Sequence, residues 1–193
     1  MIKKYLDSTR YICIHYTPSK RAKETILNSL KELKNAIEHP CLHTTILYAP
    51  VVNNKFEEAL KIISNKTSMN IPKELFYSNY HLTSYNTLSA EVEPGEYLVS
   101  LHHNFFSLLR GCLHETYVKQ YLEKGVPNDY LEYLHTSNFG KNYSPHMTLG
   151  RFESDSSRNR TIELTPSPIK DTVSGLFFSD ANSPTLKPII QIR

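Results

Sequence analysis

The chain of 193 residues contains no tryptophan and only three cysteines, Cys13, Cys41 and Cys112. An odd number of widely spaced cysteines argues against both a disulfide framework and a zinc site built on cysteine. A reducing compartment is therefore the simpler expectation. Thirteen tyrosines and eight phenylalanines replace tryptophan as the aromatic residues, and tyrosine suits half-wet positions such as the walls of a cleft.

Long apolar runs and a strong charge of either sign are also missing. No stretch approaches the ~20 apolar residues of a membrane span, and no run typical of a signal peptide follows Lys3 and Lys4. We therefore expect no membrane association, no obligate protein partner, and a cytoplasmic location, in the source cell or, for a viral protein, in the host cell. The net charge of +3 permits a phosphate-bearing ligand but is too small for a long duplex footprint.

The pattern of apolar residues predicts a mixture of helices and strands. Strands are expected at residues 10–15, 41–48, 144–152, 172–179 and 187–193, with one or two more over 75–93. Helices are expected at 20–38, 56–63, 96–112 and 117–122. Such a mixture indicates the α+β class. The length suits one domain spanning residues 1–193, built from two lobes of similar element order.

Two of the predicted strands carry nearly the same tetrapeptide, His43-Thr44-Thr45-Ile46 and His146-Met147-Thr148-Leu149. Strand side chains alternate between the two faces, so the histidine and the second threonine of each tetrapeptide share a face. A histidine and a hydroxyl side by side on a rigid strand make half of an acid–base site. Two copies facing one cleft would make a whole one.

Two imidazoles around a phosphodiester can divide the proton transfers between them. Histidine titrates near 6.5, so one ring can be neutral and accept a proton while the other is charged and donates one. The hydroxyls of Thr45 and Thr148 can donate hydrogen bonds to phosphate oxygens. This scheme requires no metal and no cofactor. Which of His43 and His146 is the acid and which is the base stays open at this level.

The paired motifs, and the segment Pro145-His146-Met147-Thr148-Leu149-Gly150-Arg151-Phe152 around the second one, resemble the 2H phosphoesterase superfamily, which includes LigT-like RNA 2′,3′-cyclic phosphodiesterases. The resemblance extends over most of the chain in element order. The four motif residues of that family fall on His43, Thr45, His146 and Thr148. The spacing between the two motifs is longer than in compact members, and residues 113–142 are a candidate insertion.

The resemblance implies a bilobal fold, with two antiparallel sheets facing a central cleft and helices outside. It also implies metal-independent cleavage of a phosphodiester. The implied substrates are small nucleotides or RNA ends: 2′,3′-cyclic phosphates, 2′,5′-linked oligoadenylates (2-5A), or cyclic nucleotides, including immune second messengers such as cGAMP. Two alternatives stay open. One is a non-catalytic nucleotide- or RNA-binding module on the same fold, and the other is a ligase that forms 2′,5′ bonds in RNA.

Other histidines imitate the motif, because the chain has nine of them among abundant serine and threonine. His15 is followed by Thr17-Pro18, which ends its strand, and His135 is the third match to a loose pattern. His81 lies in a predicted strand and is the strongest competitor for the first motif, or a residue lining the cleft. His102 and His103 are adjacent on a helix and cannot share a face for metal binding.

Three further residues are candidates for substrate binding. Tyr16 ends the first strand, where its ring could stack on a base. His81 could line the cleft from a neighbouring strand. Arg151 could clamp a phosphate, but strict alternation turns it away from His146 unless a β-bulge re-aims it. The same alternation places Gly150 beside His146 and Thr148, where it would leave room for a ligand.

Overall fold

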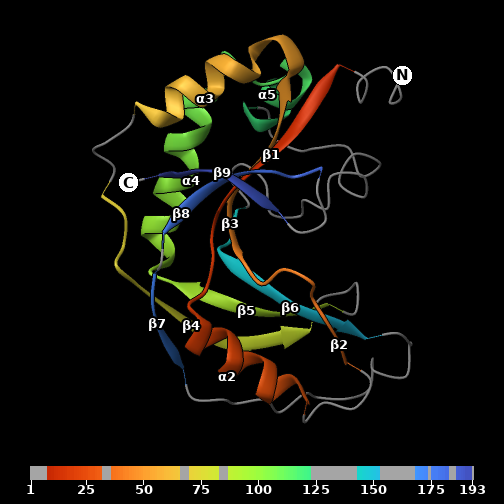
Figure 1. Cartoon of the computed structure of the whole chain (residues 1–193), viewed down its shortest axis with the longest axis vertical. Coiled ribbons are helices and arrows are strands. Elements are labelled where there is room, and N and C mark those ends of the chain that lie inside the picture. Colours follow the sequence, from red (N-terminus) through yellow and green to blue (C-terminus); the bar gives the residue numbers. More distant parts are fainter. Residues whose placement is uncertain are drawn as a thin grey trace.

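The computed structural model describes residues 8–31, 36–65, 70–82, 87–122, 143–152, 168–173, 175–182 and 186–192. Its described strands form one antiparallel sheet in the order β7-β4-β5-β6-β3-β1-β8-β9, with β2 paired to β6 (Figure 1). The strands are β1 (Thr9–Tyr16), β2 (Ala36–Glu38), β3 (Thr44–Val52), β4 (Glu74–Leu82), β5 (Thr87–Glu93), β6 (His146–Phe152), β7 (Ile169–Thr172), β8 (Leu176–Asp180) and β9 (Lys187–Ile192).

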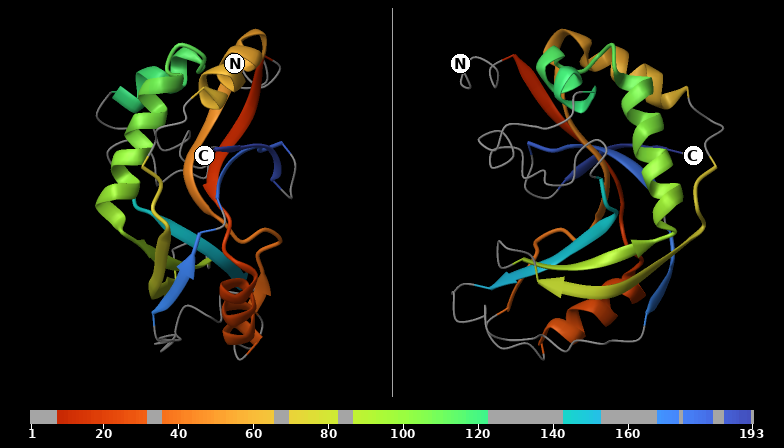
Figure 2. Two further views of the ribbon diagram at one scale, coloured as in Figure 1. Left: turned by 60° about the vertical axis from the view of Figure 1, so that its left-hand side comes forward. Right: turned by 180° about the vertical axis from the view of Figure 1, so that it is seen from behind.

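Four α-helices lie among the described residues: α2 (Lys20–Lys31), α3 (Phe56–Ser64), α4 (Gly95–Leu109) and α5 (Glu115–Leu122). Helix α2 packs beside β2, β6 and β7, whereas α3 packs on β3 and β9. The longest helix, α4, contacts both β3 and β5 and so spans the two halves of the sheet. Figure 2 shows the sheet curling, with α2 and the α3–α5 group at opposite ends of the molecule. The predicted α+β class is confirmed.

The two predicted sheets are joined into one. Strands β3 and β6 pair at Thr44 and Met147, and this pairing connects the β4–β5–β6 half to the β1–β3–β8 half. The connection is narrow, because no other pair of residues joins β3 to β6 in the described register. The strands are antiparallel, as predicted. They form one sheet and not the two that were predicted, because the pairing of Thr44 with Met147 joins the two halves.

The first predicted helix is shorter than its apolar pattern indicated. Helix α2 buries Ala22, Ile26 and Leu30 at helical spacing and ends at Lys31. The Ser19 hydroxyl caps it by accepting a hydrogen bond from the Ala22 amide at 3.2 Å. Residues 36–38, predicted as its last turn, form β2 instead. Pairing of β2 with β6 overrides the local helical pattern there.

Most of the remaining predicted elements agree with the structure to within a few residues. Two differ: β3 continues through Pro50 to Val52, and the strand predicted at 172–179 is divided between β7, which ends at Thr172, and β8, which begins at Leu176. Residues 123–142, which include most of the candidate insertion and the motif-like His135, lie outside the described residues. The main hydrophobic core includes side chains from both halves of the sheet, such as Ile14, Leu47, Leu75 and Met147. All three cysteines are free thiols. Among the described helices, none has the length and apolar character needed to cross a membrane.

Candidate active site

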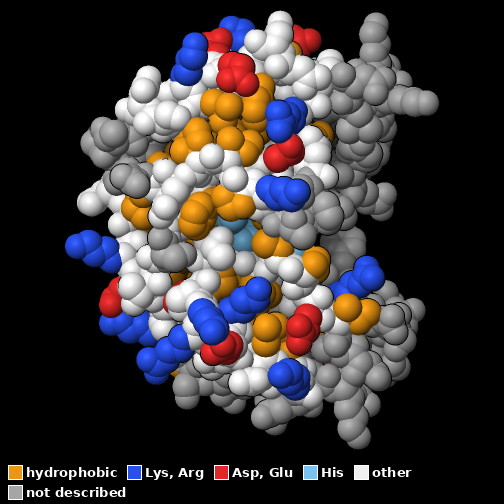
Figure 3. Space-filling view, in the orientation of Figure 1, with side chains coloured by type: hydrophobic (Ala, Val, Ile, Leu, Met, Phe, Trp, Pro, Cys, Tyr) orange, Lys and Arg blue, Asp and Glu red, His pale blue; other side chains and the backbone are white. Residues whose placement is uncertain are grey.

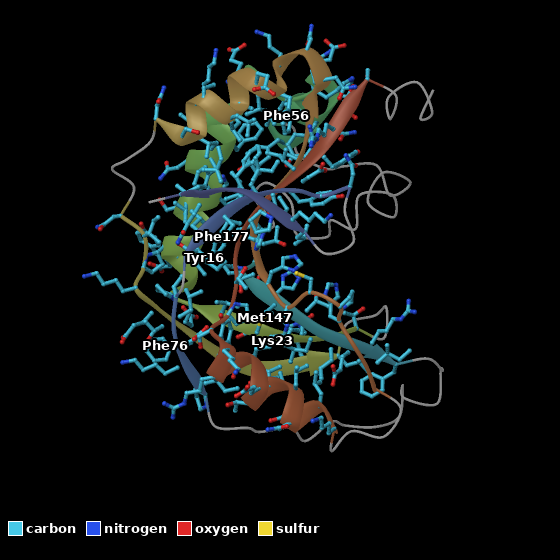
Figure 4. The ribbon with its side chains drawn as sticks, viewed as in Figure 1. Tyr16, Lys23, Phe56, Phe76, Met147 and Phe177 are labelled. Carbon is cyan, nitrogen blue, oxygen red and sulfur yellow. The ribbon has the colours of Figure 1, made fainter. Side chains whose placement is uncertain are left out.

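The pairing of β3 with β6 places the two motifs on one face of the sheet. Thr44 lies opposite Met147, and both side chains are fully buried. Figure 4 shows Met147 above α2, which carries Lys23. Their neighbours in each strand point to the other face. In an antiparallel register Thr45 then lies toward His146, and His43 toward Thr148. All four side chains are half-buried, and histidine surface is visible near the centre of the face drawn in Figure 3.

The two motif histidines make the same hydrogen bond. His43 Nδ1 lies 2.7 Å from the carbonyl oxygen of Cys41, and His146 Nδ1 lies 3.1 Å from that of Ser144. In each case the acceptor is two residues earlier in the chain, so Nδ1 carries the proton. A neutral imidazole with the proton on Nδ1 has Nε2 as its acceptor nitrogen. The local backbone therefore gives both rings the same tautomer and a similar orientation.

Burial lowers the pKa of both motif histidines. The pKa of His43 is lowered to about 4, mainly by burial and also by the charges of His39 and His146, against the raising effect of the Cys41 carbonyl. Burial also lowers the pKa of His146, assisted by the charge of His81, while the Ser144 carbonyl opposes the shift. The influence of the His146 charge on His43 shows that the two imidazoles share one electrostatic environment.

Two other histidines flank His43. The His15 ring, on β1, lies 5.4 Å from the His43 ring, centroid to centroid, in an edge-to-face arrangement. The His39 ring lies 5.8 Å from it on the approach to β3. Sequence reasoning set His15 aside, because Thr17-Pro18 ends its strand. The register of β1 with β3, which sets His15 opposite Thr45, brings it to the site; the loose match of His15 and Thr17 to the motif was the one signal in the sequence.

Where β3 diverges from β6, side chains take the place of a neighbouring strand as hydrogen-bond donors to its carbonyl groups. His102 Nδ1 donates to the Ile46 carbonyl at 2.6 Å. The Tyr117 hydroxyl donates to the Tyr48 carbonyl at 2.8 Å, and the Tyr143 hydroxyl to the Thr45 carbonyl at 2.7 Å. These bonds satisfy carbonyl groups that a neighbouring strand would otherwise take. The carbonyl groups in and beside the first motif therefore keep hydrogen-bond donors where β3 separates from β6.

The sequence matches no family model, and no curated protein sequence matches it. The structure, in contrast, is similar to solved structures over nearly its whole length. TT0787 of Thermus thermophilus has a TM-score of 0.64 at 12% identity, covering 94% of this chain and 96% of that one. Escherichia coli LigT in complex with phosphate has a TM-score of 0.61 at 15% identity, covering 95% and 96%. The apo form of LigT scores 0.56.

The chain has a 2H phosphoesterase-like fold. At these identities the similarity concerns the fold, while the roles of individual residues have to be argued from this chain. Among the described residues, no group of three or more histidine, cysteine, aspartate or glutamate side chains is arranged to hold a metal ion.

On the 2H-like fold, His81 lies in a row with the second motif. It is opposite Ser89 across β4 and β5, and Ser89 is opposite Thr148 across β5 and β6. Directly opposite residues in antiparallel strands point to the same face. The His81 ring is exposed, and its charge lowers the pKa of His146. The structure thus brings His81 to the motif face, beside the second motif rather than in place of the first.

Arg151 also reaches the motif face, and a β-bulge is the reason. Leu88 pairs with Gly150 but Ser89 with Thr148, so β6 has one extra residue between them. Beyond the bulge Arg151 pairs with Thr87, which alternates onto the same face as Ser89. Strict alternation, which turned Arg151 away, is therefore wrong here.

The same bulge removes Gly150 from the motif face. A Cβ atom built on Gly150 would lie 2.5 Å from the backbone oxygen of Ile37 in β2. Glycine at this position permits the close approach of β2. The prediction that Gly150 leaves room for a ligand beside His146 is therefore wrong.

The proposed role of Tyr16 in base stacking is wrong. Its side chain is 0% exposed and belongs to the hydrophobic core on the face of β1 that also carries Ile12 and Ile14. Its place at the end of the strand suggested exposure, but pairing of β1 with both β3 and β8 encloses it. A ring with no accessible surface cannot stack on a substrate base.

Proposed function

We propose that this chain is a phosphodiesterase that cleaves a small nucleotide or an RNA end by acid–base chemistry at His43, Thr45, His146 and Thr148. The observation that supports it most is the duplicated geometry. Two His/Thr pairs project from one sheet face, with the same Nδ1 hydrogen bond at each histidine. A buried histidine with a purely structural role has no need for an equivalent partner on the neighbouring strand.

In the proposed reaction His43 is the base and His146 the acid. The His146 charge contributes to the low pKa of His43, as expected if His146 takes up a proton first. Neutral His43 takes a proton from the attacking water as its oxygen bonds to phosphorus. Charged His146 gives a proton to the oxygen that leaves. The products are a phosphomonoester and a free hydroxyl, and one proton passes from His43 to His146 through solvent to restore the starting state.

The threonines and Arg151 complete the proposed site. The hydroxyls of Thr45 and Thr148 donate hydrogen bonds to the non-bridging oxygens and hold the phosphate in line. Arg151, on the same face beyond Thr148, supplies a positive charge to a second phosphate or to the same one. LigT, a chain of similar fold, was crystallised in complex with phosphate, and this supports a phosphate-bearing ligand for the fold.

The substrates that we propose are 2′,3′-cyclic phosphates, 2′,5′-linked oligoadenylates and cyclic di- or trinucleotides. The test is to incubate the protein with a panel of these compounds, and with matched RNA halves, and to resolve the products by chromatography. Hydrolysis of one class, unaffected by EDTA, is the expected result. Joined RNA halves would instead identify a ligase, and tight binding without product a binding module. Activity lost in EDTA and restored by zinc would contradict the acid–base mechanism.

Two variants connect the activity to the site. His43→Ala and His146→Ala should each lower turnover at least about 100-fold, because each removes one proton transfer. His114→Gln is the matched control, since His114 lies at the start of α5 and Gln preserves an acceptor for the Thr116 amide. Circular dichroism should show all three variants folded. Turnover retained by either motif variant would remove that histidine from the mechanism.

A further inference from the structure

His15 forms one wall of the His43 environment. It lies opposite Thr45 across β1 and β3, and opposite Phe177 across β1 and β8. Only 1% of its surface is exposed. Its ring is 5.4 Å from the His43 ring at an interplanar angle of 74°. A flat side chain in this position occupies space beside His43 that water would otherwise enter.

Hydroxyl groups, not charges, hold the His15 ring. Its Nε2 lies 2.8 Å from the Ser179 hydroxyl, which is fully buried on β8. A longer contact of 3.5 Å joins its Nδ1 to the Thr17 hydroxyl. The Phe177 ring packs against it at 6.0 Å, and Figure 4 labels Phe177 on β8. Because hydroxyls do not compensate a buried charge, the ring stays neutral. Burial, then the charge of His43, lower the pKa of His15 to about 4.

We propose that His15 is a positioning residue for His43: its neutral ring, fixed by Ser179, excludes water from one side of His43 and keeps His43 in the form that accepts a proton. The inference rests on the proposed role of His43 as base. It adds a third histidine that acts on the reaction through its neighbour, without contact to the substrate.

Of the two rings that flank His43, His15 is the buried one: it is 1% exposed, whereas the His39 ring, 5.8 Å from His43, is only half-buried. His39 and His146 lower the pKa of His43 through their charges. The Cys41 carbonyl accepts the Nδ1 proton and raises it. The thiols of Cys41 and Cys13 have raised pKa values, Cys13 about 12, so both are neutral at pH 7. Lys23 of α2 acts on the Cys41 thiol. Desolvation is the largest influence on His43, and His15 is a ring in direct contact with it.

The direct test is to titrate His43 by NMR in full-length protein labelled with ¹⁵N-histidine, which requires no turnover. In His15→Ala, water enters beside His43 and its pKa should rise by about one unit or more. In the double variant His15→Phe/Ser179→Ala, a ring still excludes water and the fully buried Ser179 hydroxyl is not left without a partner. The pKa of His43 should then stay within about half a unit of its native value.

Two further variants keep the test decisive. Ser179→Ala keeps the His15 ring but removes the hydroxyl that fixes its orientation. The pKa of His43 should therefore rise, by less than in His15→Ala. It also serves if His15→Ala does not fold. His114→Gln, remote from the site, should leave His43 unchanged. If His43 titrates at its native pH in His15→Ala, or in Ser179→Ala where only that variant folds, the inference is wrong.

Kinetics separate this inference from the proposed function. In His15→Ala the acid limb of the kcat profile should move to higher pH by the amount seen in the NMR titration, with KM changed less than about twofold. If the acid limb does not move while activity still requires His43, the proposed role of His15 is wrong and the proposed function stands. Full activity of His43→Ala would overturn the proposed function, while the NMR titration would still report on the contact between His15 and His43.

Discussion

The Tyr143 hydroxyl donates a 2.7 Å hydrogen bond to the Thr45 carbonyl, which ties the segment leading into the second motif to the strand that carries the first. The Tyr143 ring is nearly parallel to the His102 ring at 4.1 Å, centroid to centroid. His102 in turn donates to the next carbonyl of β3, that of Ile46. The distance between the motifs is therefore set by two side chains, Tyr143 just before β6 and His102 of α4, in addition to the single β3–β6 pairing.

Tyr143→Phe should affect both stability and catalysis. It keeps the ring stack but leaves the Thr45 carbonyl without this donor, at a cost of about 1–2 kcal/mol in the free energy of unfolding. Turnover should fall as well, because Thr45 loses its fixed position. Denaturant unfolding and kcat measure the two effects.

Tyr121→Phe is the control for that variant. It also removes a buried tyrosine hydroxyl, here one that lies 2.6 Å from His103 Nδ1, away from both motifs. It should lower stability by a similar amount and leave kcat unchanged. Equal losses of kcat in the two variants would show that Tyr143 acts through general stability alone.

Arg151→Met should weaken substrate binding, because the bulge in β6 brings the guanidinium to the motif face. Loss of one charge-assisted contact to a phosphate corresponds to roughly a tenfold rise in KM, and the dependence of KM on salt should become weaker. Arg21→Met is the matched control, since Arg21 is an exposed arginine on α2. An unchanged KM in Arg151→Met would place Arg151 outside the substrate contacts.

Gly150→Ala should destabilise the protein, because its new Cβ meets the Ile37 carbonyl of β2 at 2.5 Å. Backbone on both sides leaves little room to adjust, and overpacking of this kind costs about 1–3 kcal/mol. Gly111→Ala provides the comparison, since nothing lies within 4 Å of the position of its Cβ. Thermal unfolding of both variants measures the difference. A Tm of Gly150→Ala equal to that of Gly111→Ala would contradict the close approach of β2.

Stability should decrease on mild acidification. Burial lowers the pKa of His15, His43 and His102 to about 4, below the ordinary value of 6.5. Between these values the unfolded chain binds more protons than the folded one, so the stability present above pH 6.5 is lost as the pH falls toward 4. Each fully buried ring contributes on the order of 1–3 kcal/mol.

Urea unfolding at pH 7, 5.5 and 4.5 measures this dependence. His102→Gln removes one of the three rings, leaves the His43, Thr45, His146 and Thr148 side chains in place and keeps an N–H donor for the Ile46 carbonyl. It should make the loss of stability between pH 7 and 4.5 shallower. A free energy of unfolding that is constant over this range would show that these rings have the same pKa in the folded and the unfolded state.

The local sequence accounts for most elements of this fold, because apolar spacing and turn residues act over short distances. Ala22, Ile26 and Leu30 mark α2 by their spacing alone. The same spacing wrongly predicted a helix at Ile37, which lies in β2 and pairs with Arg151 of β6. A three-residue strand is stabilised by its partner, and that partner is more than a hundred residues away in the chain.

The sequence by itself determined the two His/Thr strands, the α+β class and the chemistry that two imidazoles and two hydroxyls can perform. These depend on local patterns, because the alternation of side chains along a strand is a property of neighbouring residues. Only the tertiary structure decided which groups surround that chemistry. It buried Tyr16, turned Arg151 toward the site, turned Gly150 away and placed His15 against His43. Each of these outcomes depends on register or on a bulge between strands distant in sequence, and a shift of one residue moves a side chain to the other face of the sheet.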